Sequence, residues 1–305
     1  MNEPARIAAA IDIGSNTIKL TIARIGNGWV VPFDGSAEVV RLSEGLGETG
    51  LIRPERLARA VTVLGGFVTY ARVQGAQTIS AVATEAVRTA RNGPEFLARV
   101  KSEVGIDVQL INGQEEAQLT SEGVLAQIDS SGSILIVDIG GGSTELIVTR
   151  DGLVLESVSL SVGSGILTDQ FVPDDPPTEA ALDIIERVTA DHALSFLDGR
   201  SQFDRMVLVG GVGNFLMAVI DGTGRVDASA LDDARETVLR LTAAELGPVV
   251  NAPIARARVL PAGFAIARSV SRIAGAPFIE SVGNGLRIGM LRRIAREGIP
   301  EEAAR

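Results

Sequence analysis

A short pattern of residues occurs twice in this chain. Residues 12–20 read DIGSNTIKL, residues 138–146 read DIGGGSTEL, and the two copies align without a gap. An apolar run precedes each copy and another follows it, so each copy predicts a strand, a tight glycine-containing turn and a second strand. A repeat of this kind limits the folds open to the chain, because it predicts two structurally related halves.

Both turns have the composition of an anion-binding site. Backbone N–H groups in a tight glycine turn can point together at phosphate oxygens, and hydroxyl and amide side chains add donors. The expected phosphate-binding residues are Gly14, Ser15, Asn16 and Thr17 in the first turn, and Gly140, Gly141, Gly142, Ser143 and Thr144 in the second. Asp12 and Asp138 head the turns, where a carboxylate suits a divalent cation. Two such turns facing each other would clamp a phosphate chain and Mg²⁺.

Composition narrows the chemistry further. The chain has 305 residues, which suits about two domains at the usual ~150 residues per domain. A hydrophobic fraction of 46% is enough to build a sizeable core in each of them. Cysteine is absent and the only histidine is His192, so disulfides, thiolate chemistry and multi-histidine metal sites are all excluded.

Charge and hydropathy also bear on the partners of the chain. A net charge of −10 argues against general nucleic-acid binding, so DNA is not an expected partner. The N-terminus lacks the features of a signal peptide, and no apolar run approaches ~20 residues, so we expect a cytoplasmic protein without membrane contact. The pattern G-x-x-x-x-G-K-[ST] does not occur in the sequence, which excludes a P-loop nucleoside triphosphatase.

Strand and helix patterns alternate along the chain, and Asn92 and Thr178 are expected to cap two of the helices. The alternation predicts an α/β fold with two domains, residues 1–127 and residues 128–305, related by duplication and facing a cleft. We expect a last helix near residues 284–297, which either stays with the second domain or packs back on the first.

Several further segments resemble one known family. They are residues 45–47 (GLG), 81–84 (AVAT), 86–88 (AVR), 113–117 (GQEEA), 207–218, 261–263 (PAG) and 285–287 (GLR). With the two turns, these segments identify the chain as a member of the exopolyphosphatase / guanosine pentaphosphate phosphohydrolase (Ppx/GppA) family. That family belongs to the actin-like ATPase superfamily, so the resemblance implies two actin-like, ribonuclease-H-like domains. It extends over nearly the whole chain.

The resemblance also implies a catalytic base. Glu115 and Glu116 begin a predicted helix, and adjacent helical residues point about 100° apart, so only one carboxylate can face a ligand. The resemblance selects Glu116 as the base that activates a hydrolytic water. It further implies that Arg88 binds phosphate oxygens. Arg91, Arg99 and Arg287 are weaker candidates for contact with phosphate, and none of the three is singled out.

The expected cofactor is Mg²⁺, with Mn²⁺ as a substitute ion. Asp138, Asp12 and Glu145 are the expected ligands, and Glu145 is also expected to orient the attacking water. Glu145 occupies the position of Lys19 in the other repeat. The turn itself therefore does not need a carboxylate there, which favours a role for Glu145 in the site.

The resemblance implies an exopolyphosphatase that releases orthophosphate from the end of polyphosphate. Hydrolysis of the nucleotide pppGpp remains open, because both reactions need the same clamp on a terminal phosphate. A non-catalytic sensor of polyphosphate or (p)ppGpp also remains open, although Glu116, Asp138 and Glu145 argue against it. A sugar or acetate kinase is disfavoured by the GQEEA segment. We expect a homodimer.

The chain departs from the family pattern at two positions. Ile166 and Ile288 stand where many members have arginine and glutamate. These departures bear on oligomer contacts and chain-length preference more than on the reaction. Because the sequence ends at Arg305, it looks like the short, two-domain type of the family.

Overall fold

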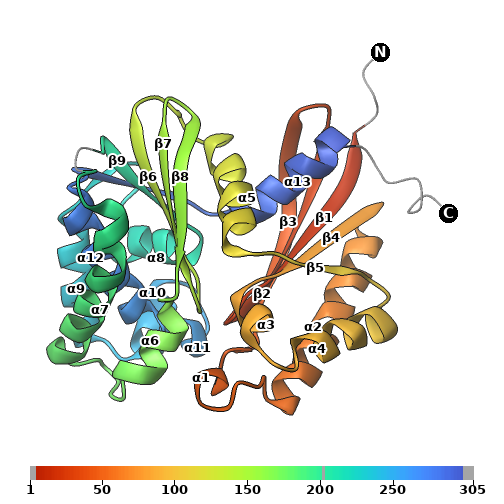
Figure 1. The fold of residues 1–305 in the computed structure, drawn as a ribbon, viewed down its shortest axis with the longest axis horizontal. Helices are drawn as coiled ribbons and strands as arrows, with labels where there is room; N and C mark the ends of the chain where they lie inside the picture. The colour runs from red at the N-terminus through yellow and green to blue at the C-terminus, as the bar shows by residue number, and fades with distance from the viewer. Residues whose placement is uncertain (1–4, 201–202, 298–305) are drawn as a thin grey trace. The chain divides into compact units, whose positions relative to one another are not determined.

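A computed structural model describes residues 5–200 and 203–297, and it shows two α/β units, each built on one mixed sheet (Figure 1). Unit 1 comprises residues 1–126 and 285–305, and unit 2 comprises residues 127–284. Residues 1–4 and 298–305, at the ends of unit 1, lie outside the described residues. The last helix of the chain therefore belongs with the first half. The division at residue 127 remains a prediction of where independent folding domains separate.

Unit 1 contains a five-stranded sheet. Its strands are β1 (Arg6–Ile13), β2 (Thr17–Gly26), β3 (Trp29–Val39), β4 (Thr78–Ala83) and β5 (Val108–Leu110). Its helices are α1 (Leu46–Thr49), α2 (Pro54–Val73), α3 (Glu85–Thr89), α4 (Gly93–Arg99), the π-helical turn η1 (Val100–Val104), α5 (Gly113–Leu125) and α13 (Leu286–Glu297).

Unit 2 contains a six-stranded sheet. Its strands are β6 (Ser133–Ile139), β7 (Thr144–Arg150), β8 (Leu153–Leu160), β9 (Arg205–Val209), β10 (Val226–Asp227) and β11 (Phe278–Val282). Its helices are α6 (Ser164–Phe171), α7 (Glu179–Leu197), α8 (Gly211–Val219), α9 (Ala230–Arg240), α10 (Ala243–Val249), α11 (Ile254–Ala257) and α12 (Leu260–Ala274).

The two sheets have the same core topology, which confirms the duplication predicted from the turns. The first has the order β3-β2-β1-β4-β5 and the second the order β8-β7-β6-β9-β11, with β10 added at the end. In each sheet an antiparallel three-strand meander is followed by two parallel strands. The predicted α/β class with two related halves is confirmed. The cleft expected between them remains a prediction.

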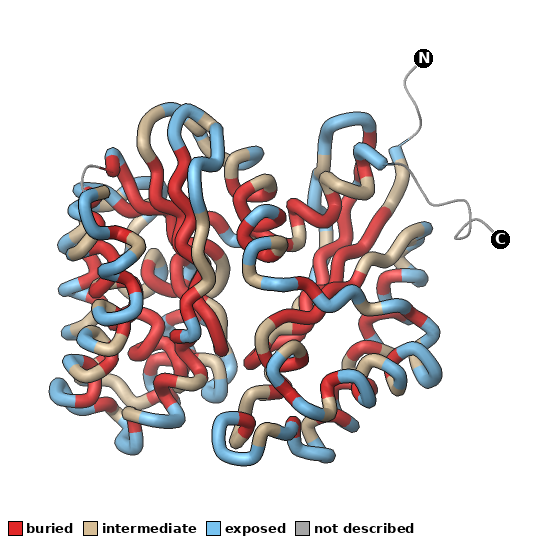
Figure 2. Tube along the Cα trace, viewed as in Figure 1, coloured by how far each residue is buried: buried red, intermediate tan, exposed pale blue. Residues whose placement is uncertain are grey.

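Most of β1 is buried (Figure 2). Its residues belong alternately to two different hydrophobic clusters, one on each face of the sheet. Ile11 and Ile13 point to the face covered by α2. Ala8 and Ala10 point to the opposite face, where they pack with residues of α5 and α13. Side chains alternate along a strand, so small residues at every second position let α13 approach the sheet closely.

Of the two helix caps predicted from the sequence, one is present in the structure. Thr178 accepts a hydrogen bond from the backbone N–H of Ala181 and caps α7 as predicted. Asn92 precedes α4, but its side chain does not cap the helix. Instead its amide pairs in both directions with the backbone of Ile52, at 2.9 and 2.8 Å. The capping prediction for Asn92 is wrong, because a distant backbone segment offers both a donor and an acceptor.

The lengths of the helices bear on membrane insertion. Within the residues that the structure describes, we find no helix with both the length and the apolarity that crossing a membrane requires.

Candidate active site

The second predicted phosphate turn is held in place by the start of α6. The backbone N–H of Ser164 donates to the carbonyl of Gly140, and those of Gly165 and Ile166 donate to the carbonyl of Gly141. These are donors of the first helical turn, which lack partners within their own helix. The turn therefore satisfies the N-terminus of α6, and α6 fixes the carbonyl side of the turn.

The first turn is held in a similar way by the segment after β3. The backbone N–H groups of Val40 and Arg41 both donate to the carbonyl of Asn16, at 3.0 and 2.9 Å. The N–H of Ser43 donates to the carbonyl of Ser15 at 3.0 Å. In both repeats, then, the chain that follows the third strand of the meander supports the turn from its carbonyl side.

This support sets the direction of the backbone donors. In a planar trans peptide, the carbonyl of one residue and the N–H of the next point in opposite directions. Since the carbonyls of Ser15 and Asn16 face the supporting segment, the N–H groups of Asn16 and Thr17 point away from it. The same reasoning applies to Gly141 and Gly142 in the second turn. Each turn thus presents neighbouring N–H groups on one side, as an anion site requires.

The residues at the base of each turn are cross-strand pairs in identical register. Asp12 of β1 lies opposite Lys19 of β2, and Asp138 of β6 lies opposite Glu145 of β7. Directly opposed side chains of an antiparallel pair are close neighbours on one face of the sheet. The duplication therefore places an acid–base pair in unit 1 and a pair of carboxylates in unit 2.

Asp12 is surrounded by positive charge. Its Oδ2 lies 4.0 Å from Nζ of Lys19 and 3.8 Å from Nη1 of Arg287. These two cations reduce the attraction of the Asp12 carboxylate for a further cation. Its assignment as a metal ligand remains a prediction, and its surroundings favour it less than those of Asp138.

The carboxylates of unit 2 suit a magnesium ion better. Glu145 is 1% exposed, and its Oε1 accepts a hydrogen bond of 2.7 Å from the hydroxyl of Ser159. Mg²⁺ is commonly held by one or two carboxylates, with waters and substrate phosphates completing the shell. Across residues 5–200 and 203–297, no group of three or more acidic or histidine side chains is arranged to hold a metal. Asp138 and Glu145 therefore fit an ion shared with a phosphate substrate.

The two glutamates at the start of α5 have different surroundings. Glu115 closes a capping box: its Oε2 accepts from the N–H of Asn112, whose side chain accepts from the N–H groups of Gln114 and Glu115. Glu116 is buried at 8% exposure on another face of the same turn. The geometry gives Glu115 a structural task, and the assignment of Glu116 as the catalytic base remains a prediction.

Arg88 lies close to this helix start. Its Nη1 donates to the carbonyl of Ile111 at 2.7 Å, and its Nη2 pairs with Glu85 in the same helix. Ile111 immediately precedes Asn112, the residue that caps α5. Arg88 therefore holds the connection between β5 and α5. Its predicted contact with phosphate remains a prediction.

Arg287, one of the weaker arginine candidates in the sequence, contacts Asp12 at the base of the first turn. The only available signal was its place in the GLR segment of the family resemblance. Ser159, the partner of Glu145, had no signal at all, because its relevance depends on the register between β7 and β8.

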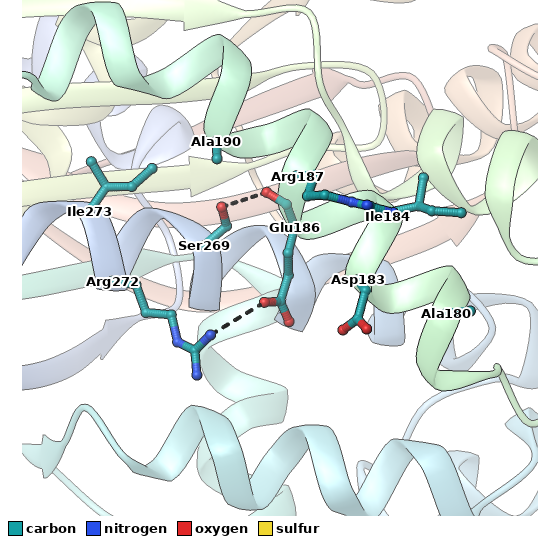
Figure 3. A pocket seen from close by; sticks show the side chains of 9 residues that line it. All are labelled: Ala180, Asp183, Ile184, Glu186, Arg187, Ala190, Ser269, Arg272 and Ile273. Carbon is teal, nitrogen blue, oxygen red and sulfur yellow. Dashed lines mark hydrogen bonds and ion pairs between the residues drawn. The ribbon is translucent and has the colours of Figure 1, made fainter.

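One groove, of about 580 Å³, lies between α7 and α12 of unit 2 (Figure 3). Its lining includes none of the residues predicted for the site. Figure 3 shows Glu186 at its centre, joined to the hydroxyl of Ser269 through its carbonyl and to Arg272 through its carboxylate. Arg268 and Arg235 also pair with Glu186, at 2.5 and 3.4 Å. These contacts tie three helices together, which is a structural role.

Several curated proteins are similar to part of the chain. Exopolyphosphatase 1 of Mycobacterium tuberculosis is 34% identical over 169 residues, which cover 55% of this chain and 49% of that protein. Exopolyphosphatase 2 of the same organism is 35% identical over 180 residues, which cover 56% of each chain. The chain thus spans about half the length of the curated relatives it matches.

Solved structures match over nearly the whole chain. The Ppx/GppA family member of Aquifex aeolicus has a TM-score of 0.79 and 28% identity, and the match covers 97% of this chain and 100% of that one. An exopolyphosphatase of Cytophaga hutchinsonii has a TM-score of 0.87, with 97% and 99% coverage. Its identity is 23%, so this likeness bears on the fold alone.

The family model described as the Ppx/GppA phosphatase family matches residues 21–297. This range includes the second turn, α5 with Glu116, and Arg287, and it agrees with the resemblance found in the sequence. The chain belongs to the Ppx/GppA phosphatase family.

Proposed function

We propose that this protein is an exopolyphosphatase that releases orthophosphate from the end of inorganic polyphosphate by Mg²⁺-dependent hydrolysis. The observation that carries the proposal is the pair of matched turns. The backbone carbonyls of each turn accept hydrogen bonds from the segment that supports it, so the N–H groups of the turn point to the opposite side. Two preorganised donor sets suit a ligand with many phosphate oxygens, and phosphoryl transfer depends mainly on such positioning and electrostatics.

Each predicted residue then has a defined task. The backbone N–H groups of the turns, with Ser15, Asn16, Ser143 and Thr144, bind phosphate oxygens. Arg88 adds a positive charge near the start of α5, which would attract phosphate oxygens. Glu116 positions the attacking water and accepts its proton, which leaves a hydroxide-like oxygen to attack the terminal phosphorus. The bond from the terminal phosphorus to the bridging oxygen breaks, so one orthophosphate is released and the bridging oxygen stays on a chain that is one unit shorter.

Asp138 and Glu145 hold the metal in this proposal. Bound Mg²⁺ would neutralise negative charge on the phosphates when it is present. Glu145 is buried, and the hydroxyl of Ser159 donates a hydrogen bond to one of its carboxylate oxygens. A homodimer remains our prediction for the assembly.

Phosphate release from several substrates tests the proposed activity. The substrates are long polyphosphate, short polyphosphate, pppGpp and ATP, each with Mg²⁺ and with EDTA. We expect release from polyphosphate that requires Mg²⁺ and far less from ATP. Release mainly from pppGpp would assign the same chemistry to a nucleotide substrate. Binding of polyphosphate or (p)ppGpp without any release would instead identify a sensor.

The metal assignment predicts a change in the Mg²⁺ requirement. Asp138→Asn and Glu145→Gln each remove one ligand charge, so we expect the Mg²⁺ concentration for half-maximal activity to rise by ~10-fold or more. The measurement is a Mg²⁺ titration of phosphate release. Glu156→Gln is the control, because Glu156 lies on the neighbouring strand β8 and pairs only at the surface with Arg200. Equal Mg²⁺ requirements in all three variants would contradict the assignment.

A further inference from the structure

Arg287 joins the last helix of the chain to the first phosphate turn. It lies in the first turn of α13, and its Nε donates to the hydroxyl of Thr21 at 2.7 Å. Its Nη1 lies 3.8 Å from Oδ2 of Asp12. The side chains of Arg287 and Asp12 are only 12% and 10% exposed, so water screens this interaction less than it would at the surface.

Asp12, Lys19 and Thr21 lie on one face of the β1–β2 hairpin. Asp12 is directly opposite Lys19, and Thr21 lies two residues beyond Lys19 on β2. Residues two apart on a strand point to the same side. Arg287 therefore lies over the face that carries Asp12 and Lys19, at the end of the hairpin where the turn begins.

The position of α13 is set by its contact with α5. A Cβ atom at Gly289 would lie 1.9 Å from the carbonyl oxygen of Leu119, and one at Gly123 would lie 2.0 Å from that of Gly285. The two helix backbones thus touch, and only glycine permits this approach. Since α5 also carries Glu116, this packing holds the proposed base and Arg287 in one assembly.

We propose that Arg287 is a positioning residue for the first phosphate turn. With Lys19 it brackets the Asp12 carboxylate, so the three charges sum to +1 at the base of the turn. The bond to Thr21 fixes the guanidinium, which places its positive charge 3.8 Å from the carboxylate of Asp12. Asp12 is thereby held between the two cations, which keeps its negative charge from repelling the phosphates. This inference rests on the proposed phosphate-binding function of the same turn.

Three variants separate the charge of Arg287 from its position. Arg287→Met removes the positive charge. Arg287→Lys keeps the charge but removes the planar guanidinium. Thr21→Val removes only the hydroxyl that accepts the hydrogen bond from Nε of Arg287. Arg296→Met is the matched control, because Arg296 lies on the same helix but pairs with Glu122 of α5. Each change is made in the wild type and in a Glu116→Gln background, in which polyphosphate of defined length is bound without turnover.

We expect Arg287→Met to weaken polyphosphate binding by ~10-fold, the size expected when a charge-assisted hydrogen bond is lost. The KM should rise with it, and the affinity should depend less on salt because one cation is gone. Arg287→Lys and Thr21→Val should both weaken binding by about 3-fold, since each loses only the fixed orientation. Arg296→Met should bind as the parent does.

Two results would overturn the inference. One is an Arg287→Met protein that melts earlier but binds polyphosphate as tightly as Arg296→Met, which would make Arg287 merely structural. The other is unchanged polyphosphate binding in Thr21→Val together with a large loss of binding in both Arg287 variants. That result would show that Arg287 does not act through a position fixed by Thr21. If the wild type binds polyphosphate but releases no phosphate, the proposed activity fails while the binding comparison still decides the role of Arg287. If it binds no polyphosphate, both fail.

Discussion

Replacing Glu116 with glutamine is expected to lower the rate of phosphate release by 10²–10⁴-fold, the usual contribution of a general base. Glutamine has nearly the same shape as glutamate, but its amide cannot accept a proton from water. The buried position of Glu116 at the start of α5 should be retained. We therefore expect polyphosphate affinity to stay within about 3-fold of the wild type. Single-turnover phosphate release and equilibrium binding measure the two quantities separately.

Glu115→Gln is the matched control for that experiment. It changes the adjacent residue by the same atoms, and glutamine can still accept the N–H of Asn112 in the capping box. We expect activity and melting temperature near those of the wild type. A large loss of rate in Glu115→Gln, beside normal turnover in Glu116→Gln, would show that the base has been assigned to the wrong carboxylate.

The difference between these two glutamates was partly present in the sequence. The segment Asn112 to Glu115 has the N-cap and third-position glutamate of a capping box, which is a local signature. Reading that signature would have assigned Glu115 to the helix terminus without any family resemblance. The duplication of the turns was also readable, because it depends on matching short segments. The structure confirms it through the two equivalent sheet orders.

Other parts of the site depend on contacts between segments that are distant in the chain, so neighbouring residues alone could not predict them. Helix α6 was not predicted, since the glycines around its start are poor helix formers. Its first N–H groups are satisfied by Gly140 and Gly141, residues that only the folded meander brings near. His192 in α7 is exposed, and its Nδ1 contacts the carbonyl of Val188.

Replacing Gly289 with alanine is expected to destabilise unit 1 and to reduce activity together. In an exposed helix interior, alanine is more favourable than glycine by up to ~1 kcal/mol, so the substitution by itself would stabilise the helix. The added Cβ would lie 1.9 Å from the carbonyl oxygen of Leu119, however, and that atom belongs to the backbone of α5. The helices must separate, and overpacking of this kind costs about 1–3 kcal/mol or more. The clash therefore outweighs the gain.

The loss of activity follows from what the two helices carry. A shift between α5 and α13 displaces Glu116 relative to Arg287, and displacement by ~1 Å can cost 10²-fold in rate. Gly66→Ala is the control, because Gly66 lies within α2 of the same unit and an added Cβ there meets no atom within 4 Å. We expect Gly289→Ala to melt roughly 5 °C or more below the wild type, given ~2–4 °C per kcal/mol. Gly66→Ala should melt at or above the wild-type temperature. Equal melting temperatures and rates for the two variants would show that α5 and α13 do not pack as closely as the structure has them.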